Sequence, residues 1–161
     1  MNLSANQIIA TTLKAARGAG FPMAQASQFA TAAAQHLIEG RSQEDISQAL
    51  IHMEASPIYT LPTTLDEVCL NGSQSVPNAL LPDLIASYVE TAPFQAQCIR
   101  AGGTILIKHI SDRPPTKTVA TRVEMSPTLW AHLNKLAAKT YVPASDASRL
   151  AGAGAGLTDN D

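Results

Sequence analysis

The spacing of prolines is the strongest constraint on what this 161-residue chain can fold into. Four of its ten prolines fall between residues 57 and 82, together with an Asn-Gly pair. Proline lacks a backbone N–H and disfavours helix in the preceding residue, and Asn-Gly is a frequent turn sequence. We therefore expect residues 57–82 to form a long proline-rich connection within a single globular domain over residues 1–150, with only a turn of helix near residues 65–70.

The part before the connection, residues 1–56, has the apolar spacing of three amphipathic helices. A capping-box pattern at Ser4 and Gln7 predicts a helix over residues 5–17. Apolar and small residues then recur at helical spacing, which predicts a second helix ending at Gly40. A third helix follows a start signal at Ser42 and ends where the connection begins.

The part after the connection, over residues 83–150, mixes helix and strand signals. Apolar spacing predicts a short helix over residues 84–89, and Pro93 is placed to begin another helix that ends at a Gly-Gly pair. Residues 104–110 are dense in β-branched side chains and form the clearest strand, and the alternation over residues 118–125 predicts a second strand.

These two strands predict a β-hairpin, which needs a helix over its apolar face to be stable. Ser126 and Pro127 supply the start of such a helix, which ends near Lys139. The expected fold is therefore α+β, with an N-terminal helical group plus a C-terminal β-hairpin packed on helices, followed by a Gly-rich C-terminal tail at residues 151–161.

Composition argues against several classes of function. The net charge is −2 and aromatic residues make up 4%, whereas nucleic-acid sites need basic patches and aromatic stacking surfaces. The chain has no apolar run of membrane-spanning length and no signal-peptide pattern, so we expect a cytoplasmic protein without membrane partners.

Cys69 and Cys98 are expected to be free thiols. The four histidines do not have metal-ligand spacing, and we expect no metal and no cofactor.

The segment over residues 151–161 has the most unusual composition. Its three glycines alternate with alanine at Gly152, Gly154 and Gly156. Consecutive glycine amides can bind a phosphate, but a phosphate loop follows a strand and opens a helix, and this run does neither. The other interpretations are a solvated tail, or a docking segment in which Leu157 is an apolar anchor and Asp159 and Asp161 meet basic groups.

Basic residues between positions 100 and 149 are numerous enough to receive such a segment. Eight bases stand there against three acids. The bases are Arg100, Lys108, Arg113, Lys117, Arg122, Lys135, Lys139 and Arg149. They either form a positive patch or are the ordinary charged ends of strands and helices.

Two segments resemble a bacterial domain-of-unknown-function family. They are Lys14–Gly20, with the sequence KAARGAG, and Pro143–Asp161, with the more distinctive sequence PASDASRLAGAGAGLTDND. The family has no assigned activity, so the resemblance implies no catalytic residue. It implies that the Gly-rich tail is a regular part of such chains, which favours docking of the tail over a solvated tail.

Two hypotheses of function remain. The first is a noncatalytic binding or accessory protein whose tail docks into a groove of its own chain, of a sister subunit in a homo-oligomer or of another protein. The alternative is a small enzyme or ligand-binding domain for an anionic metabolite, with His109 or His132 as acid or base. The candidate binding residues are Lys14, Arg17, Arg122, Ser145, Ser148, Arg149, Gly152, Gly154, Gly156, Asp159 and Asp161. No serine or cysteine has a base at an identifiable spacing, so the sequence assigns no catalytic residue.

Overall fold

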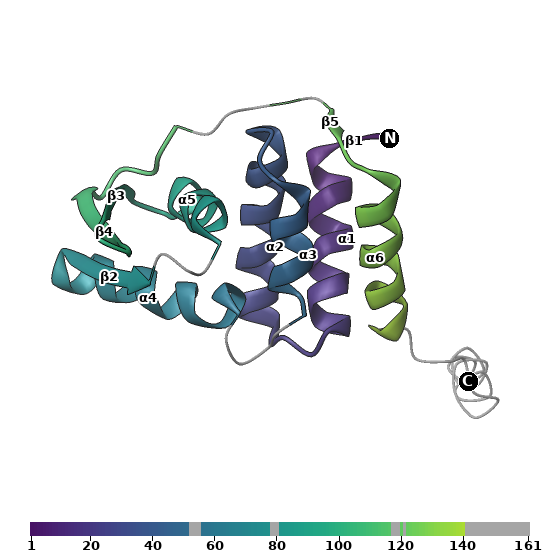
Figure 1. Ribbon diagram of the computed structural model, residues 1–161, viewed down its shortest axis with the longest axis horizontal. Helices are drawn as coiled ribbons and strands as arrows, with labels where there is room; N and C mark the ends of the chain where they lie inside the picture. The colour runs from purple at the N-terminus through teal and green to yellow at the C-terminus, as the bar shows by residue number, and fades with distance from the viewer. Residues whose placement is uncertain (52–55, 78–80, 117–119, 121, 141–161) are drawn as a thin grey trace, which may run out of the picture.

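The protein has the expected α+β fold in a computed structural model that describes residues 1–51, 56–77, 81–116, 120 and 122–140. The elements are β1 (Asn2–Leu3), α1 (Ala5–Gly18), α2 (Met23–Ile38), α3 (Gln43–Ala49), α4 (Pro57–Asn71), β2 (Ser73–Pro77), α5 (Pro82–Thr91), β3 (Gln95–Ala101), β4 (Thr104–Ser111), β5 (Val123–Glu124), α6 (Pro127–Ala137) and the 3₁₀ turn η1 (Ala138–Thr140). Figure 1 shows two parts side by side. We call α1, α2, α3 and α6 the helical group, and α4, α5 and the three-stranded sheet the sheet half.

The helical group brings together segments from both ends of the described chain. Ser4 caps α1 as predicted, since its hydroxyl accepts from the Gln7 amide at 3.2 Å and its own amide donates to the Gln7 side chain at 2.9 Å. β1 pairs antiparallel with β5, so α1 and α6 both start at the same end of the group. Their C-terminal ends also meet, because a Cβ on Gly18 would lie 1.9 Å from the carbonyl oxygen of Leu136. The two helices therefore run parallel in close contact (Figure 1).

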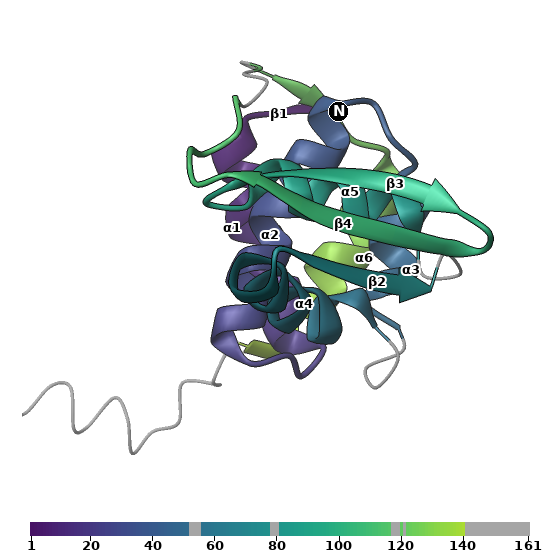
Figure 2. The ribbon, with the colours of Figure 1, turned by 90° about the vertical axis from the view of Figure 1, so that its left-hand side faces the viewer.

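The sheet half is an antiparallel sheet in the order β2-β4-β3, with α4 and α5 against one of its faces (Figure 2). Ile105 and Ile107 of β4 point to these helices and are buried. The two halves meet along α2, which packs on α1 on one side and on α4 and α5 on the other. Small residues allow this close packing, since Ala26, Ala30 and Ala33 are fully buried. A single apolar core thus runs through both halves.

The expected connection over residues 57–82 is wrong for most of its length, because it contains α4 and β2; residues 78–80 lie outside the described part. Pro57 occupies the first turn of α4, where no amide hydrogen is needed, and the Ser56 hydroxyl caps the helix. Pro62 lies inside α4 and removes one backbone hydrogen bond. A stripe of buried residues at helical spacing offsets this loss: Ile58, Leu61, Leu65 and Val68.

The helix expected after Pro93 is also wrong, because this segment is strand β3. The Gly-Gly pair that suggested a helix end is instead the turn of a two-residue hairpin. Gly102 and Gly103 both have positive φ, at 54° and 85°, as such hairpin turns require. Ala101 and Thr104 are the register partners next to the turn.

The C-terminal β-hairpin is therefore β3–β4, and the expected pairing of residues 104–110 with 118–125 is wrong. β4 pairs with β3 on one edge and with β2 on the other. Of the expected second strand, Val123 and Glu124 form β5 and pair with β1, while residues 117–119 and 121 lie outside the described part. The helix after Ser126 is present as α6, and the Ser126 hydroxyl caps it as predicted.

Candidate functional site

A cleft of about 500 Å³ lies at the end of the helical group where α1 and α6 finish and α2 begins. We call it the basic cleft. It is lined by Leu13, Lys14, Arg17, Gly18, Met23, Lys139 and Thr140. The lining has three basic side chains and no acidic one among the described residues. This sign of charge favours a ligand that carries carboxylates or phosphates.

The local sequence explains why the three bases converge. Lys14 and Arg17 are exposed near the C-terminal end of α1, and Arg17 lies in its last turn. Arg17 also donates to the carbonyl oxygen of Phe21 at 3.2 Å, which fixes the guanidinium near the start of α2. Lys139 comes from η1, which the close contact of α1 and α6 at Gly18 places beside them. Cations are also favourable near helix C-termini, because the last carbonyl groups give that end a negative potential.

The structure brings only part of the predicted site together. Lys14 and Arg17 share the basic cleft, and Lys139 joins them. Arg122 lies at the opposite end of α1, where it donates to the Asn2 carbonyl oxygen at 3.2 Å. The remaining candidates lie outside the described residues: Ser145, Ser148, Arg149, Gly152, Gly154, Gly156, Asp159 and Asp161.

Neither histidine of the alternative hypothesis lines the basic cleft. His109 lies on β4 in the sheet half, where its ring packs against Phe94 and its Nε2 is 3.1 Å from a carboxylate oxygen of Asp112. His132 lies on α6 and is half-buried. The described lining of the cleft therefore offers neither of the two histidines as an acid or base.

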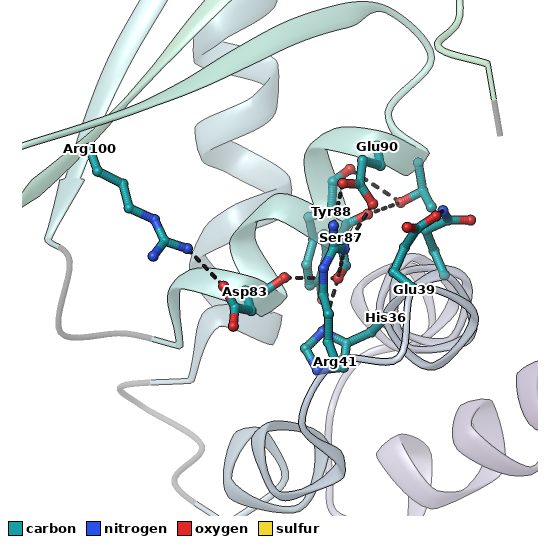
Figure 3. Close-up of polar contacts among 10 residues, drawn as sticks. His36, Glu39, Arg41, Asp83, Ser87, Tyr88, Glu90 and Arg100 are labelled. Atoms are coloured by element: carbon teal, nitrogen blue, oxygen red, sulfur yellow. Dashed lines mark hydrogen bonds and ion pairs between the residues drawn. The ribbon is translucent and has the colours of Figure 1, made fainter. Parts of the chain in front are cut away.

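A second polar cluster, which the sequence did not single out, lies where α2 meets α5 (Figure 3). The ring of His36, at the end of α2, is fully buried. Its Nδ1 is 2.9 Å from the Ser87 hydroxyl of α5, and its Nε2 is 2.8 Å from the Ser42 carbonyl oxygen ahead of α3. Arg41 donates to the Ser87 hydroxyl at 2.7 Å and binds the Glu90 carboxylate through both of its terminal nitrogens. We call these five residues the His36 joint.

The surroundings of the joint shift the proton affinities of several groups. Burial lowers the pKa of His36, and the Ser42 carbonyl and the nearby Asp45 carboxylate partly oppose this effect. The hydrogen bonds to Glu90 raise the pKa of Arg41. Burial raises the pKa of Asp45, whose carboxylate lies 3.7 Å from Nε2 of His36.

The serine, histidine and aspartate of this cluster resemble the composition of a hydrolase triad, but their placement does not suit catalysis. Ser87 and His36 are both fully buried, so a substrate cannot reach the hydroxyl. The Ser87 hydroxyl also accepts a hydrogen bond from Arg41, which occupies one of its lone pairs. A nucleophile must instead face the bound substrate. The joint is therefore a contact between helices rather than a site for chemistry on a ligand.

The described residues hold no group of three histidine, cysteine or acidic side chains arranged for a metal ion. Cys69 and Cys98 are free thiols, as predicted, and burial raises the pKa of the Cys98 thiol. None of the helices in the described ranges is both long and apolar enough to span a bilayer.

Comparisons of the chain with protein-family models, with curated proteins and with solved structures gave no match.

Proposed function

We propose that this protein is a noncatalytic binding protein, and that residues 151–161 are the segment that docks in its basic cleft. The observation that carries the proposal is the convergence of Lys14, Arg17 and Lys139 on one hollow that has no acidic residue among its described lining. The docking segment has the complementary charge, since it holds Asp159 and Asp161 and no base.

The cleft lies close in sequence to the proposed docking segment. Thr140 is part of the cleft lining and is followed directly by residues 141–161. Ten residues, 141–150, separate it from the docking segment, and an extended chain covers about 3.3 Å per residue. The segment therefore has enough chain to occupy the cleft of its own molecule.

The cleft also offers an apolar contact for the segment. Leu13 lines its wall, and Met23 lies on its rim with 60% of its surface exposed. Leu157 is the one large apolar residue of the docking segment and would bury its side chain against these two residues. Carboxylate pairing at the rim and one apolar anchor is a common way to bind a short peptide.

Binding, rather than catalysis, is supported by the chemistry of the lining. The described lining consists of two apolar residues, three bases, a glycine and a threonine. This described lining holds no histidine, aspartate, glutamate or cysteine, the residue types that most often act as acid, base or nucleophile. The same three bases suit an anionic metabolite, which is the second candidate function.

Hydrogen–deuterium exchange of the full chain tests the docking. We expect the amides of residues 151–161 to exchange more slowly than those of the same segment as a free peptide. Replacing Arg17 and Lys139 by glutamate should bring their exchange to the free-peptide rate. Replacing Lys108 and Arg113 by glutamate is the matched control, because it reverses two exposed charges outside the cleft. Free-peptide exchange rates in the unsubstituted protein would overturn the proposal.

The metabolite alternative is separated by adding citrate or inorganic phosphate to the same full-length proteins. A ligand at about a hundred times its dissociation constant stabilises the folded state by about 2.7 kcal/mol. If either anion raises the melting temperature of the unsubstituted protein, and the Arg17→Glu, Lys139→Glu protein does not respond, the cleft takes free anions. If the segment is protected and neither anion stabilises the protein, docking of residues 151–161 is the function of the cleft.

A further inference from the structure

The His36 joint connects the two halves of the molecule through one buried ring. His36 ends α2, Ser42 precedes α3, and Ser87 and Glu90 lie on α5, so the joint links the helical group to the sheet half. Arg41 reaches across the same boundary to Ser87 and Glu90. Figure 3 shows His36 and Arg41 beside Ser87 and Glu90 of α5.

The hydrogen bonds of the joint are complete when His36 is neutral. The Ser42 carbonyl oxygen can only accept, so Nε2 of His36 must carry a proton and donate to it. A neutral ring then has an unprotonated Nδ1, which can accept the hydrogen of the Ser87 hydroxyl at 2.9 Å; the Asp83 carbonyl oxygen, also at 2.9 Å, is a second acceptor for the same hydrogen. The Ser87 oxygen in turn accepts from Arg41. Each polar atom of the ring therefore has a partner of the correct type.

A second proton on His36 changes this arrangement. Nδ1 then becomes a donor and must direct its hydrogen at the Ser87 oxygen, which already accepts from Arg41. The Ser87 hydroxyl hydrogen is then donated only to the Asp83 carbonyl oxygen, with which it already lies in hydrogen-bond contact at 2.9 Å. Two cations, an imidazolium and a guanidinium, would then donate to one buried oxygen. Their repulsion and the burial of the new charge both disfavour this state.

The charged groups around the ring do not remove this cost. α3 supplies Asp45, whose carboxylate is 3.7 Å from Nε2 and favours the protonated ring. Glu90 of α5 is held by both terminal nitrogens of Arg41. The carboxylate of Asp83 is directed at Arg100 of β3, at 2.7 Å, and only its backbone carbonyl approaches the joint. Glu39, at the end of α2, accepts from the side chain of Gln35.

We propose that the His36 joint is a proton-sensitive latch between the helical group and the sheet half. Uptake of one proton by His36 places an imidazolium and the Arg41 guanidinium on the same buried Ser87 oxygen, and their repulsion weakens the hold of α5 on α2 and α3. The latch is closed at neutral pH and loosens on acidification.

The direction of the pH effect follows from linkage. In the unfolded chain His36 has the ordinary histidine pKa of about 6.5. Burial lowers this pKa in the folded protein, so the unfolded state takes up the proton first as the pH falls. Stability from this group is fully present above about pH 6.5 and is lost between that value and the lower pKa of the folded state.

The unsubstituted protein provides the first test. NMR of the histidine ring protons should show His36 titrating below pH 6.5. Amide exchange in α5, corrected for the intrinsic effect of pH, should accelerate as His36 charges. Each unit of pKa lowering corresponds to a tenfold change in the opening equilibrium. Titration of His36 at or above 6.5, or α5 protection that does not change across the titration, would overturn the proposal.

Variants of two histidines provide the second test. His36→Gln keeps an amide donor near Ser42 and cannot titrate, so the loss of stability between pH 7.5 and pH 5 should shrink. His132→Gln removes the histidine of α6, outside the joint, and should leave that loss unchanged. If His36→Gln does not fold, the titration and exchange of the unsubstituted protein still decide the question. An unchanged pH dependence in a folded His36→Gln protein contradicts the latch.

Discussion

Arg41 shows how one side chain holds the two halves of the molecule together. Its guanidinium serves two acceptors at once, the Ser87 hydroxyl and both carboxylate oxygens of Glu90. A lysine presents a single compact charge and cannot form these bidentate hydrogen bonds. We expect Arg41→Lys to lower the free energy of unfolding by about 1–2 kcal/mol, since hydrogen bonds to charged groups contribute on that order when they are partly buried. Urea denaturation at pH 7.5 measures the change.

Arg100 is the matched control for this prediction. It pairs with Asp83 at 2.7 Å, but both side chains are more than half exposed. Exposed ion pairs contribute roughly 0–1 kcal/mol, and lysine can still form one, so Arg100→Lys should shift the midpoint little. Equal losses of unfolding free energy from the two substitutions would mean that the bidentate hydrogen bonds of Arg41 add nothing beyond its charge.

The sequence predicted two of the three bases of the basic cleft, Lys14 and Arg17, but did not place Lys139 beside them. Lys14 and Arg17 are three residues apart on a predicted helix, so their common face is a local property. Lys139 reaches the same cleft only because α6 packs parallel to α1, and no local pattern specifies that packing. The His36 joint is still less visible in the sequence, because Ser87 and Glu90 lie 51 and 49 residues from the partners they bind. Only the polar histidine at the end of an alanine-rich helix signals it.

At the scale of elements, the contact between α1 and α6 depends on one missing side chain. A Cβ at Gly18 would lie 1.9 Å from the carbonyl oxygen of Leu136, which is backbone and cannot rotate away. Gly18→Ala should therefore separate the helices and destabilise the protein by about 1–3 kcal/mol, although alanine is the better helix former by about 1 kcal/mol. Trp130 of α6 is the only tryptophan and packs against the core, so its fluorescence should shift to the red.

Gly40 separates this packing effect from backbone strain. It has φ +68°, but nothing lies within 4 Å of the position of its Cβ. Gly40→Ala should lose about 1–2 kcal/mol through the left-handed conformation alone and should leave Trp130 fluorescence unchanged. A Gly18→Ala protein with native stability and native fluorescence would contradict the close contact.

The elements that sequence reasoning missed share a physical cause. Helix caps, helical spacing and β-branched density are local signals, and they predicted α1, β4 and α6. The prolines of residues 57–71 argued against a helix, although these residues also have regular apolar spacing. Pro57 fits the first turn of α4, and the buried face of the helix offsets the hydrogen bond that Pro62 removes. In β3 a Gly-Gly pair suits both a helix end and a hairpin turn, and only pairing with β4 decides between them.

At the scale of the whole molecule, the shared core predicts that the two halves unfold together at neutral pH. Buried residues form one cluster from Ile8 in the helical group to Ile107 in the sheet half. α2 of the helical group packs on α4 and α5 of the sheet half, so neither half can open without exposing its buried face. Loss of one half would remove much of the apolar burial of the other, and a single cooperative transition is expected.

Two probes placed in different halves test this cooperativity. Trp130 reports on the helical group, and a fluorophore on Cys69, which is exposed on α4, reports on the sheet half. Half-burial and a raised pKa make Cys98 the slower thiol to react, so labelling should favour Cys69. At pH 7.5 both probes should give the same urea midpoint, with the slope expected for the full chain. Separate midpoints would show that the two halves unfold independently, and that the apolar contacts between them are too weak to make unfolding cooperative.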